Sequence, residues 1–117
     1  METRFPYVAV TIQFPGPKDL PDIKTELLVD TGFDGDVILP NSYIDQLGNA
    51  EGLIRWQLAD GSTVSAAVYE CSIQLSGLPS FFPATVSLLG AEGLVGRSIT
   101  DRVRLILDHG ERVLIEP

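Results

Sequence analysis

One acidic residue of this chain stands where a carboxylate could do acid–base chemistry. Asp30 begins the triplet Asp30-Thr31-Gly32, which follows the apolar residues 27–29 directly. Thr31 can hold such a turn through its hydroxyl, and Gly32 lets the backbone approach a substrate or a second chain closely. An Asp that only shapes a turn is the alternative. The triplet occurs once, so a site with two such carboxylates requires a second copy of the chain.

A second element of interest is Gly96-Arg97, which two aliphatic residues precede and an apolar stretch follows. The sequence predicts, in this order, an Asp-Thr-Gly triplet, an Asp-Gly hairpin, two aliphatic residues, Gly-Arg and a short helix. Retropepsin-like aspartic proteases have the same order of motifs. The chain resembles this family over about residues 6–117, and its small bacterial clan AA members more closely still. Three blocks carry the closer resemblance: residues 30–40, 58–62 and 113–117.

The resemblance implies an aspartic endopeptidase that acts as a symmetric homodimer, with Asp30 of each chain as the catalytic carboxylate. Two carboxylates about 3 Å apart cannot both ionise, so the pair shares a proton and supplies one base and one acid. Such a pair activates a water toward a peptide carbonyl under mildly acid conditions, without a covalent intermediate. The expected partners are a second copy of the chain and a peptide or protein substrate, and no cofactor is expected.

The resemblance also assigns supporting roles. Asp60 and Gly61 would form the tip of a flap that excludes water from the bound peptide. Asp34 would meet Arg97 in a partly buried ion pair near the catalytic carboxylate, with Gly96 beside it.

Two aromatic residues near these motifs complicate the comparison. Phe33 stands where the retroviral enzymes have a small residue, although the bacterial group accepts Phe there. Trp56 lies near the base of the expected flap, where it is either a wall of the substrate site or a core or interface aromatic.

Other functions agree less well with the sequence. The acidic residues around Gly35 are similar to a calcium loop, but Gly32 stands where an EF-hand needs Asp or Asn, and Asn41 where it needs a bidentate Glu. His109 is the only histidine, so a metal site or a His-based triad lacks a second member, and no metal is expected. A catalytically silent, dimeric protein-interaction module on the same fold remains the alternative to an enzyme.

Composition favours a single domain over residues 1–117, because a chain that is 44% hydrophobic at this length can build one core. A net charge of −8 disfavours binding to nucleic acid or to an anionic membrane. Neither a membrane span nor a signal-peptide pattern is found, so a cytoplasmic location is expected. Cys71, the only cysteine, excludes an internal disulfide and is expected to be a buried, inert thiol.

Short strands separated by turns predict an all-β fold, a small closed barrel with one or two short helices. The resemblance makes this barrel one of the retropepsin type. Asn41 and Gly48 would cap and close the first helix. The hairpin near the middle of the chain would turn tightly at Asp60-Gly61. Strands are expected over residues 5–14, 23–29 and 81–89, and a loop over residues 15–21. Helices are expected over residues 41–47 and 97–102, and hairpins over residues 53–75 and 103–115. The last hairpin and the N-terminal strand would contribute to a dimer interface.

Overall fold

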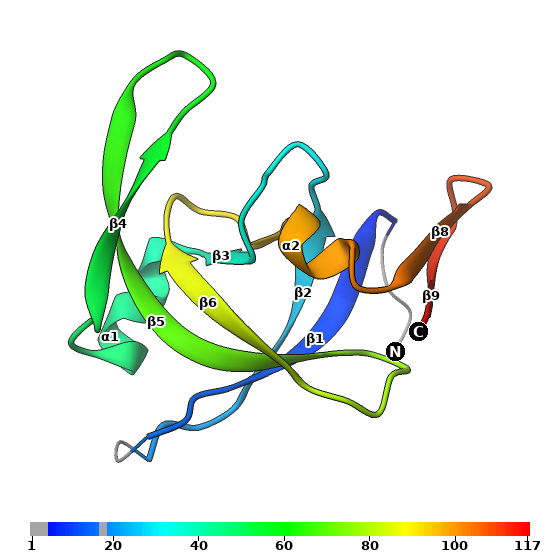
Figure 1. Cartoon of the computed structure of the whole chain (residues 1–117), viewed down its shortest axis with the longest axis horizontal. Helices are drawn as coiled ribbons and strands as arrows, with labels where there is room; N and C mark the ends of the chain where they lie inside the picture. Colours follow the sequence, from blue (N-terminus) through cyan, green and yellow to red (C-terminus); the bar gives the residue numbers. More distant parts are fainter. Residues whose placement is uncertain (1–4, 17–18) are drawn as a thin grey trace.

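Strands make up about half of the computed structural model, which describes residues 5–16 and 19–117 (Figure 1). The predicted all-β class with short helices is confirmed. Pro17 and Lys18, which belong to the predicted loop over 15–21, lie outside the described residues. The strands in chain order are β1 (Tyr7–Gln13), β2 (Ile23–Val29), β3 (Val37–Leu39), β4 (Gly52–Gln57), β5 (Thr63–Leu75), β6 (Phe82–Leu88), β7 (Leu94–Val95), β8 (Arg104–Asp108) and β9 (Arg112–Glu116). A 3₁₀ turn, η1 (Asn41–Tyr43), and two one-turn helices, α1 (Ile44–Leu47) and α2 (Arg97–Thr100), complete the fold.

The main sheet closes on itself. Its strands follow the order β1-β2-β7-β3-β6-β5-β4, and β1 pairs with β5 as well as with β2. Every strand of this sheet except β4 therefore belongs to a hydrogen-bonded ring, as the predicted closed barrel requires. Closure leaves few unpaired strand edges, which stabilises a small β domain.

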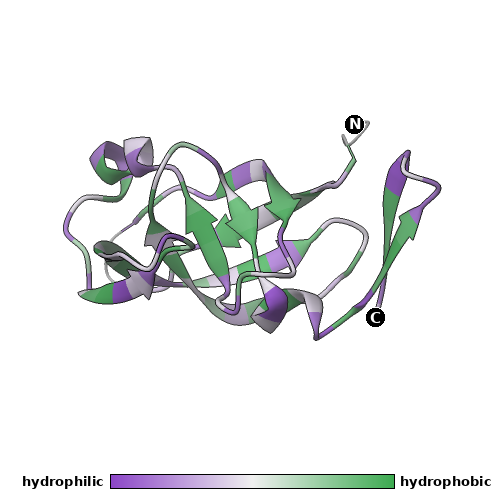
Figure 2. Cartoon of the chain, turned by 90° about the horizontal axis from the view of Figure 1, so that it is seen from above, coloured by the Kyte–Doolittle hydropathy of each residue, from purple (hydrophilic) through white to green (hydrophobic). Residues whose placement is uncertain are grey.

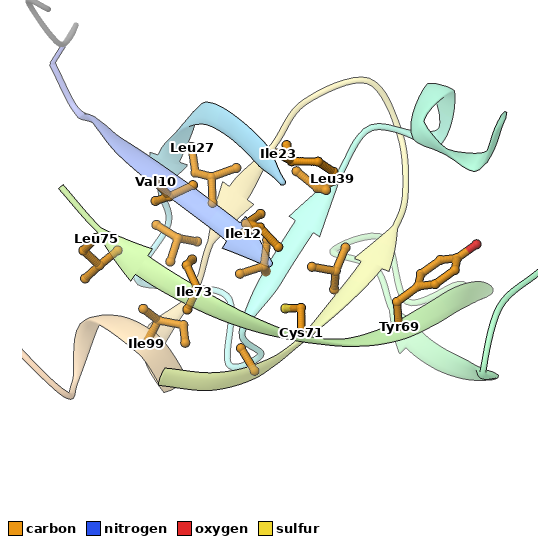
Figure 3. Close-up of a cluster of buried hydrophobic side chains, with 14 of the residues drawn as sticks. Val10, Ile12, Ile23, Leu27, Leu39, Tyr69, Cys71, Ile73, Leu75 and Ile99 are labelled. Atoms are coloured by element: carbon orange, nitrogen blue, oxygen red, sulfur yellow. The ribbon is translucent and has the colours of Figure 1, made fainter. Parts of the chain in front are cut away.

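Alternating side chains explain why these strands surround one core. In β1, Val8, Val10 and Ile12 are buried while the residues between them are more exposed. Side chains from several strands meet inside the ring, where Ile12, Leu27 and Ile73 point toward one another (Figure 3). The short strand β3 is buried along its whole length, as expected for a strand covered on both faces.

The last hairpin, β8–β9, forms a separate two-stranded sheet beside the main one (Figure 2). Leu105 pairs with Ile115, and both pack against the core from one face of this hairpin. On its opposite face, Ile106 pairs with Leu114, which is 37% exposed. The hairpin therefore presents apolar surface away from the core of its own chain.

Two local predictions were wrong. Asn41 does not cap the first helix: it is the first residue of the 3₁₀ turn, and extended Pro40 precedes it without a side-chain capping bond. Gly48 ends the helix at φ +71°, as predicted. The middle hairpin has the five-residue connection 58–62 rather than a two-residue turn, because Gly61 alone has a positive φ, +88°, and Asp60 bonds locally to Ser62.

Candidate active site

Asp30 stands at the end of β2, and its own groups close the turn that follows. Its backbone amide donates to the carbonyl oxygen of Val95 in β7 (3.0 Å), which fixes the start of the turn. Its carboxylate accepts from the amide of Gly32 (3.0 Å), and its carbonyl oxygen accepts from the amide of Phe33 (3.2 Å). Thr31 is exposed, and the bonds that close the turn are those of Asp30.

The segment from Gly96 to Ser98 supports the loop after Asp30 from below. The amide of Gly96 donates to the carbonyl oxygen of Asp36 (2.8 Å), and the amide of Ser98 donates to that of Gly35 (3.3 Å). A Cβ at position 96 would meet the carbonyl oxygen of Gly35 and lie 2.6 Å from that of Phe33. Gly96 is therefore required by close backbone packing, not by an unusual φ.

The predicted contact between Asp34 and Arg97 is present. Their side chains approach to 3.4 Å, and the hydroxyl of Ser98 donates to the carbonyl oxygen of Asp34 (2.6 Å). The expectation of partial burial was wrong for the single chain, because the two side chains are 85% and 54% exposed. The loop lies on the surface of the ring, so water reaches both charged groups.

The loop from Asp30 to Asp36 and the tip of the β4–β5 hairpin rise on the same side of the molecule, at the top of Figure 1. At the tip, Asp60 accepts hydrogen bonds from the amide (2.9 Å) and the hydroxyl (2.6 Å) of Ser62. These bonds lower the pKa of Asp60, the hydroxyl bond most of all. The predicted flap residues Asp60 and Gly61 are thus ordered by local bonds at the end of an exposed hairpin.

An aromatic contact joins this hairpin to the loop. The rings of Phe33 and Trp56 meet edge to face, with centroids 5.0 Å apart and planes at 67°. Gly35 makes room for both rings, since a Cβ there would overlap Phe33 and lie 2.7 Å from Trp56. The sequence predicted neither this contact nor the need for glycine at position 35. The only feature of the sequence that could have indicated a role for Gly35 is that it lies close to the Asp30-Thr31-Gly32 triplet along the chain.

Asp36 plays a structural part that the sequence did not indicate. Its carboxylate accepts a hydrogen bond from the amide of Thr85 at 2.9 Å, which ties the end of the loop to β6. The loop from Asp30 to Asp36 is therefore attached to β7, to the segment around Gly96 and to β6. A catalytic carboxylate needs such support, because its position must be held closely.

Solved structures with the same chain path identify the fold. The protease of EIAV, solved with the inhibitor HBY-793, superposes with a TM-score of 0.55 at 20% identity and covers 87% of this chain and 89% of its own. A retropepsin-like aspartic protease from Rickettsia conorii superposes with the same TM-score at 18% identity and covers 94% of this chain and 81% of its own. The chain has a retropepsin-like fold. No protein-family model and no curated protein sequence matches it.

Among the described residues, no group of three or more His, Cys, Asp or Glu side chains could hold a metal ion. Within the same residues, the helices are too short to cross a bilayer.

Proposed function

We propose that the chain is an aspartic endopeptidase that acts as a symmetric homodimer, with one catalytic Asp30 from each copy. The observation that carries this proposal is the Asp30 turn. Its carboxylate stands at the end of β2, and the segment at Gly96 supports the loop that follows. The turn lies on the side of the fold from which the β4–β5 hairpin rises. Proteases share this fold, and in the proposed dimer an extended peptide would lie between the turn and the hairpin.

The chemistry follows from two carboxylates that share one proton. The ionised Asp30 takes a proton from a water placed between the two, and the water oxygen attacks the peptide carbonyl. The protonated Asp30 gives its proton to the carbonyl oxygen. The first Asp30 then passes the proton that it took from the water to the amine as the C–N bond of the tetrahedral intermediate breaks. A hydroxyl proton of the intermediate returns to the other Asp30, so the product is a carboxylic acid and one proton remains on the pair.

The dimer proposal is supported by the outer face of the β8–β9 hairpin. The apolar pair Ile106 and Leu114 lies between the charged pairs Arg104–Glu116 and Asp108–Arg112. A two-fold axis would bring this self-complementary face against its copy. Burying the apolar pair would stabilise the dimer, and the flanking charges would fix its register.

The first test is cleavage of a mixed peptide library by the chain and by Asp30→Asn, near pH 5 and pH 7. The library includes peptides with small residues at every position. Asp30→Asn should abolish cleavage, since it removes the base and keeps the size of the side chain. Asp45→Asn, an exposed change in α1, is the matched control and should cleave as the original does. Equal cleavage by the original chain and Asp30→Asn would refute the proposal.

The second test addresses the shared site. A fixed amount of the original chain is refolded with an equal amount of Asp30→Asn. If each site needs both copies, random pairing leaves about half of the original activity. Undiminished activity would show that one chain is sufficient. A chain that dimerises and binds peptides but cleaves none would instead be the catalytically silent interaction module.

A further inference from the structure

The contact between Phe33 and Trp56 joins the loop after Asp30 to the β4–β5 hairpin. Phe33 follows the Asp30-Thr31-Gly32 triplet directly, whereas Trp56 lies on β4, one residue before that strand ends. The two half-buried rings are in edge-to-face contact, and one of them belongs to the same loop as the proposed catalytic carboxylate.

The Phe33 side of this contact is fixed. The carbonyl oxygen of Phe33 accepts from the amide of Arg97 at 2.8 Å. The rings sit over Gly35, whose own carbonyl oxygen is bonded to Ser98. The backbone of Phe33 therefore cannot shift without breaking hydrogen bonds that also support the loop after Asp30.

The Trp56 side is held by packing alone. Among the described residues, its buried indole nitrogen is the one buried side-chain polar atom with no hydrogen-bond partner. A buried N–H without an acceptor is unfavourable, so nothing polar anchors the ring where it lies. Trp56 also belongs to an edge strand, since β4 pairs with β5 only in the described sheet. A movement of the β4–β5 hairpin would therefore carry the ring of Trp56 with it.

We propose that the Phe33–Trp56 pair determines substrate specificity, by filling a subsite so that the peptide side chain facing it must be small. Gly, Ala or Ser fits there with the pair intact. A Leu or Phe fits only if Trp56 swings away with the flap, which breaks the aromatic contact. This inference rests on the proposed function for the position of the peptide, and its test separates the two.

The experiment uses one peptide backbone, chosen from a sequence that the library assay shows to be cleaved. Ala, Leu or Phe is placed in turn at each of the four positions flanking the scissile bond. The chain, Trp56→Ala, Trp56→Phe and Leu53→Ala are compared by kcat/KM. Leu53 is the matched control, because it lies on the same strand and is 74% exposed. The same peptides, fluorescently labelled, are titrated into each variant in the Asp30→Asn background, where binding is read by anisotropy. If the library gives no cleaved sequence, an arbitrary extended peptide series is used for binding.

At one position, the original chain should favour Ala over Phe by about tenfold or more in kcat/KM. Trp56→Ala should abolish or reverse that ratio, Trp56→Phe should keep part of it, and Leu53→Ala should leave it unchanged. The binding ratios should change in the same way. These results would also exclude general damage to the flap, which would lower activity toward all peptides alike.

Unchanged selectivity of Trp56→Ala at every position, in cleavage and in binding, overturns the inference and leaves the proposed function intact. Size-selective binding that Trp56→Ala abolishes, without cleavage by the original chain, overturns the catalytic proposal and supports the inference. If no peptide binds any variant, the inference is overturned too.

Discussion

The backbone amide of Arg97 donates a hydrogen bond to the carbonyl oxygen of Phe33 at 2.8 Å, so that two distant segments of the chain meet beneath the Asp30 turn. This bond forms only because the neighbouring residue, Gly96, has no side chain to hold the segments apart. The placement of the proposed catalytic carboxylate thus depends on a residue that does no chemistry.

Replacing Gly96 with Ala should destabilise the fold by about 1 to 3 kcal/mol, because its Cβ would press on backbone oxygens that cannot turn aside. Urea denaturation measures this change in the free energy of unfolding. Gly52→Ala is the control, since its Cβ would meet only Val68, at an ordinary 3.6 Å. Equal stability of the two variants would contradict the packing argument.

The Asp34–Arg97 ion pair should contribute little to the stability of the single chain. Both side chains are more than half exposed, so their coupling free energy should be at most about 1 kcal/mol and should weaken in 1 M salt. A double-mutant cycle with Asp34→Ala and Arg97→Ala, read by urea unfolding at low protein concentration, measures it. A coupling of about 3 kcal/mol or more would mean that the pair is buried, contrary to the structure of the single chain.

Replacing Leu114 with Arg should dissociate the proposed dimer. The change would put a charge into the apolar centre of the outer face of β8–β9, where Leu114 pairs with Ile106. Light scattering at micromolar concentration should give a dimer for the original chain and a monomer for the variant, which should also lose peptide cleavage. Leu53→Arg on β4 is the control and should stay dimeric. A monomeric original chain would remove the basis of the shared site.

Cys71 should make stability fall at alkaline pH. Burial, and secondarily Asp36 and Glu51, raises the pKa of this thiol from 9.0 to about 12. The folded chain therefore keeps its proton between about pH 9 and 12, while the unfolded chain loses it. The contribution is complete below pH 9 and is lost as pH rises, by about 1.4 kcal/mol per pH unit at most.

Cys71→Ala isolates this effect, because other groups, including Tyr69, also titrate at high pH. The free energy of unfolding of the original chain minus that of the variant should be constant from pH 7 to 8.5 and then decrease toward pH 10.5. A constant difference over the whole range would show that the thiol ionises as readily in the folded chain. Slow labelling of the folded original chain by a thiol reagent at pH 8 should agree with the burial.

The sequence by itself determined most of the strands and the position of Asp30 in a turn at the end of one of them. Alternating apolar residues mark β1, and the end of β2 at Val29 was predicted to the residue. The end of α1 at Gly48 was also predicted, since it rests on a backbone conformation that glycine favours. These features depend on neighbours in the chain. A local pattern is therefore sufficient to predict them.

Only the tertiary structure decided which distant segments meet. The pairing of β1 with β5, the support of the Asp30 loop by Gly96 and the contact of Phe33 with Trp56 each join residues that no local pattern relates. Exposure of the Asp34–Arg97 pair likewise depends on how the whole ring packs. Side-chain burial and close backbone approach arise when the ring closes, and so the sequence named the residues of the candidate site while the fold set their environment.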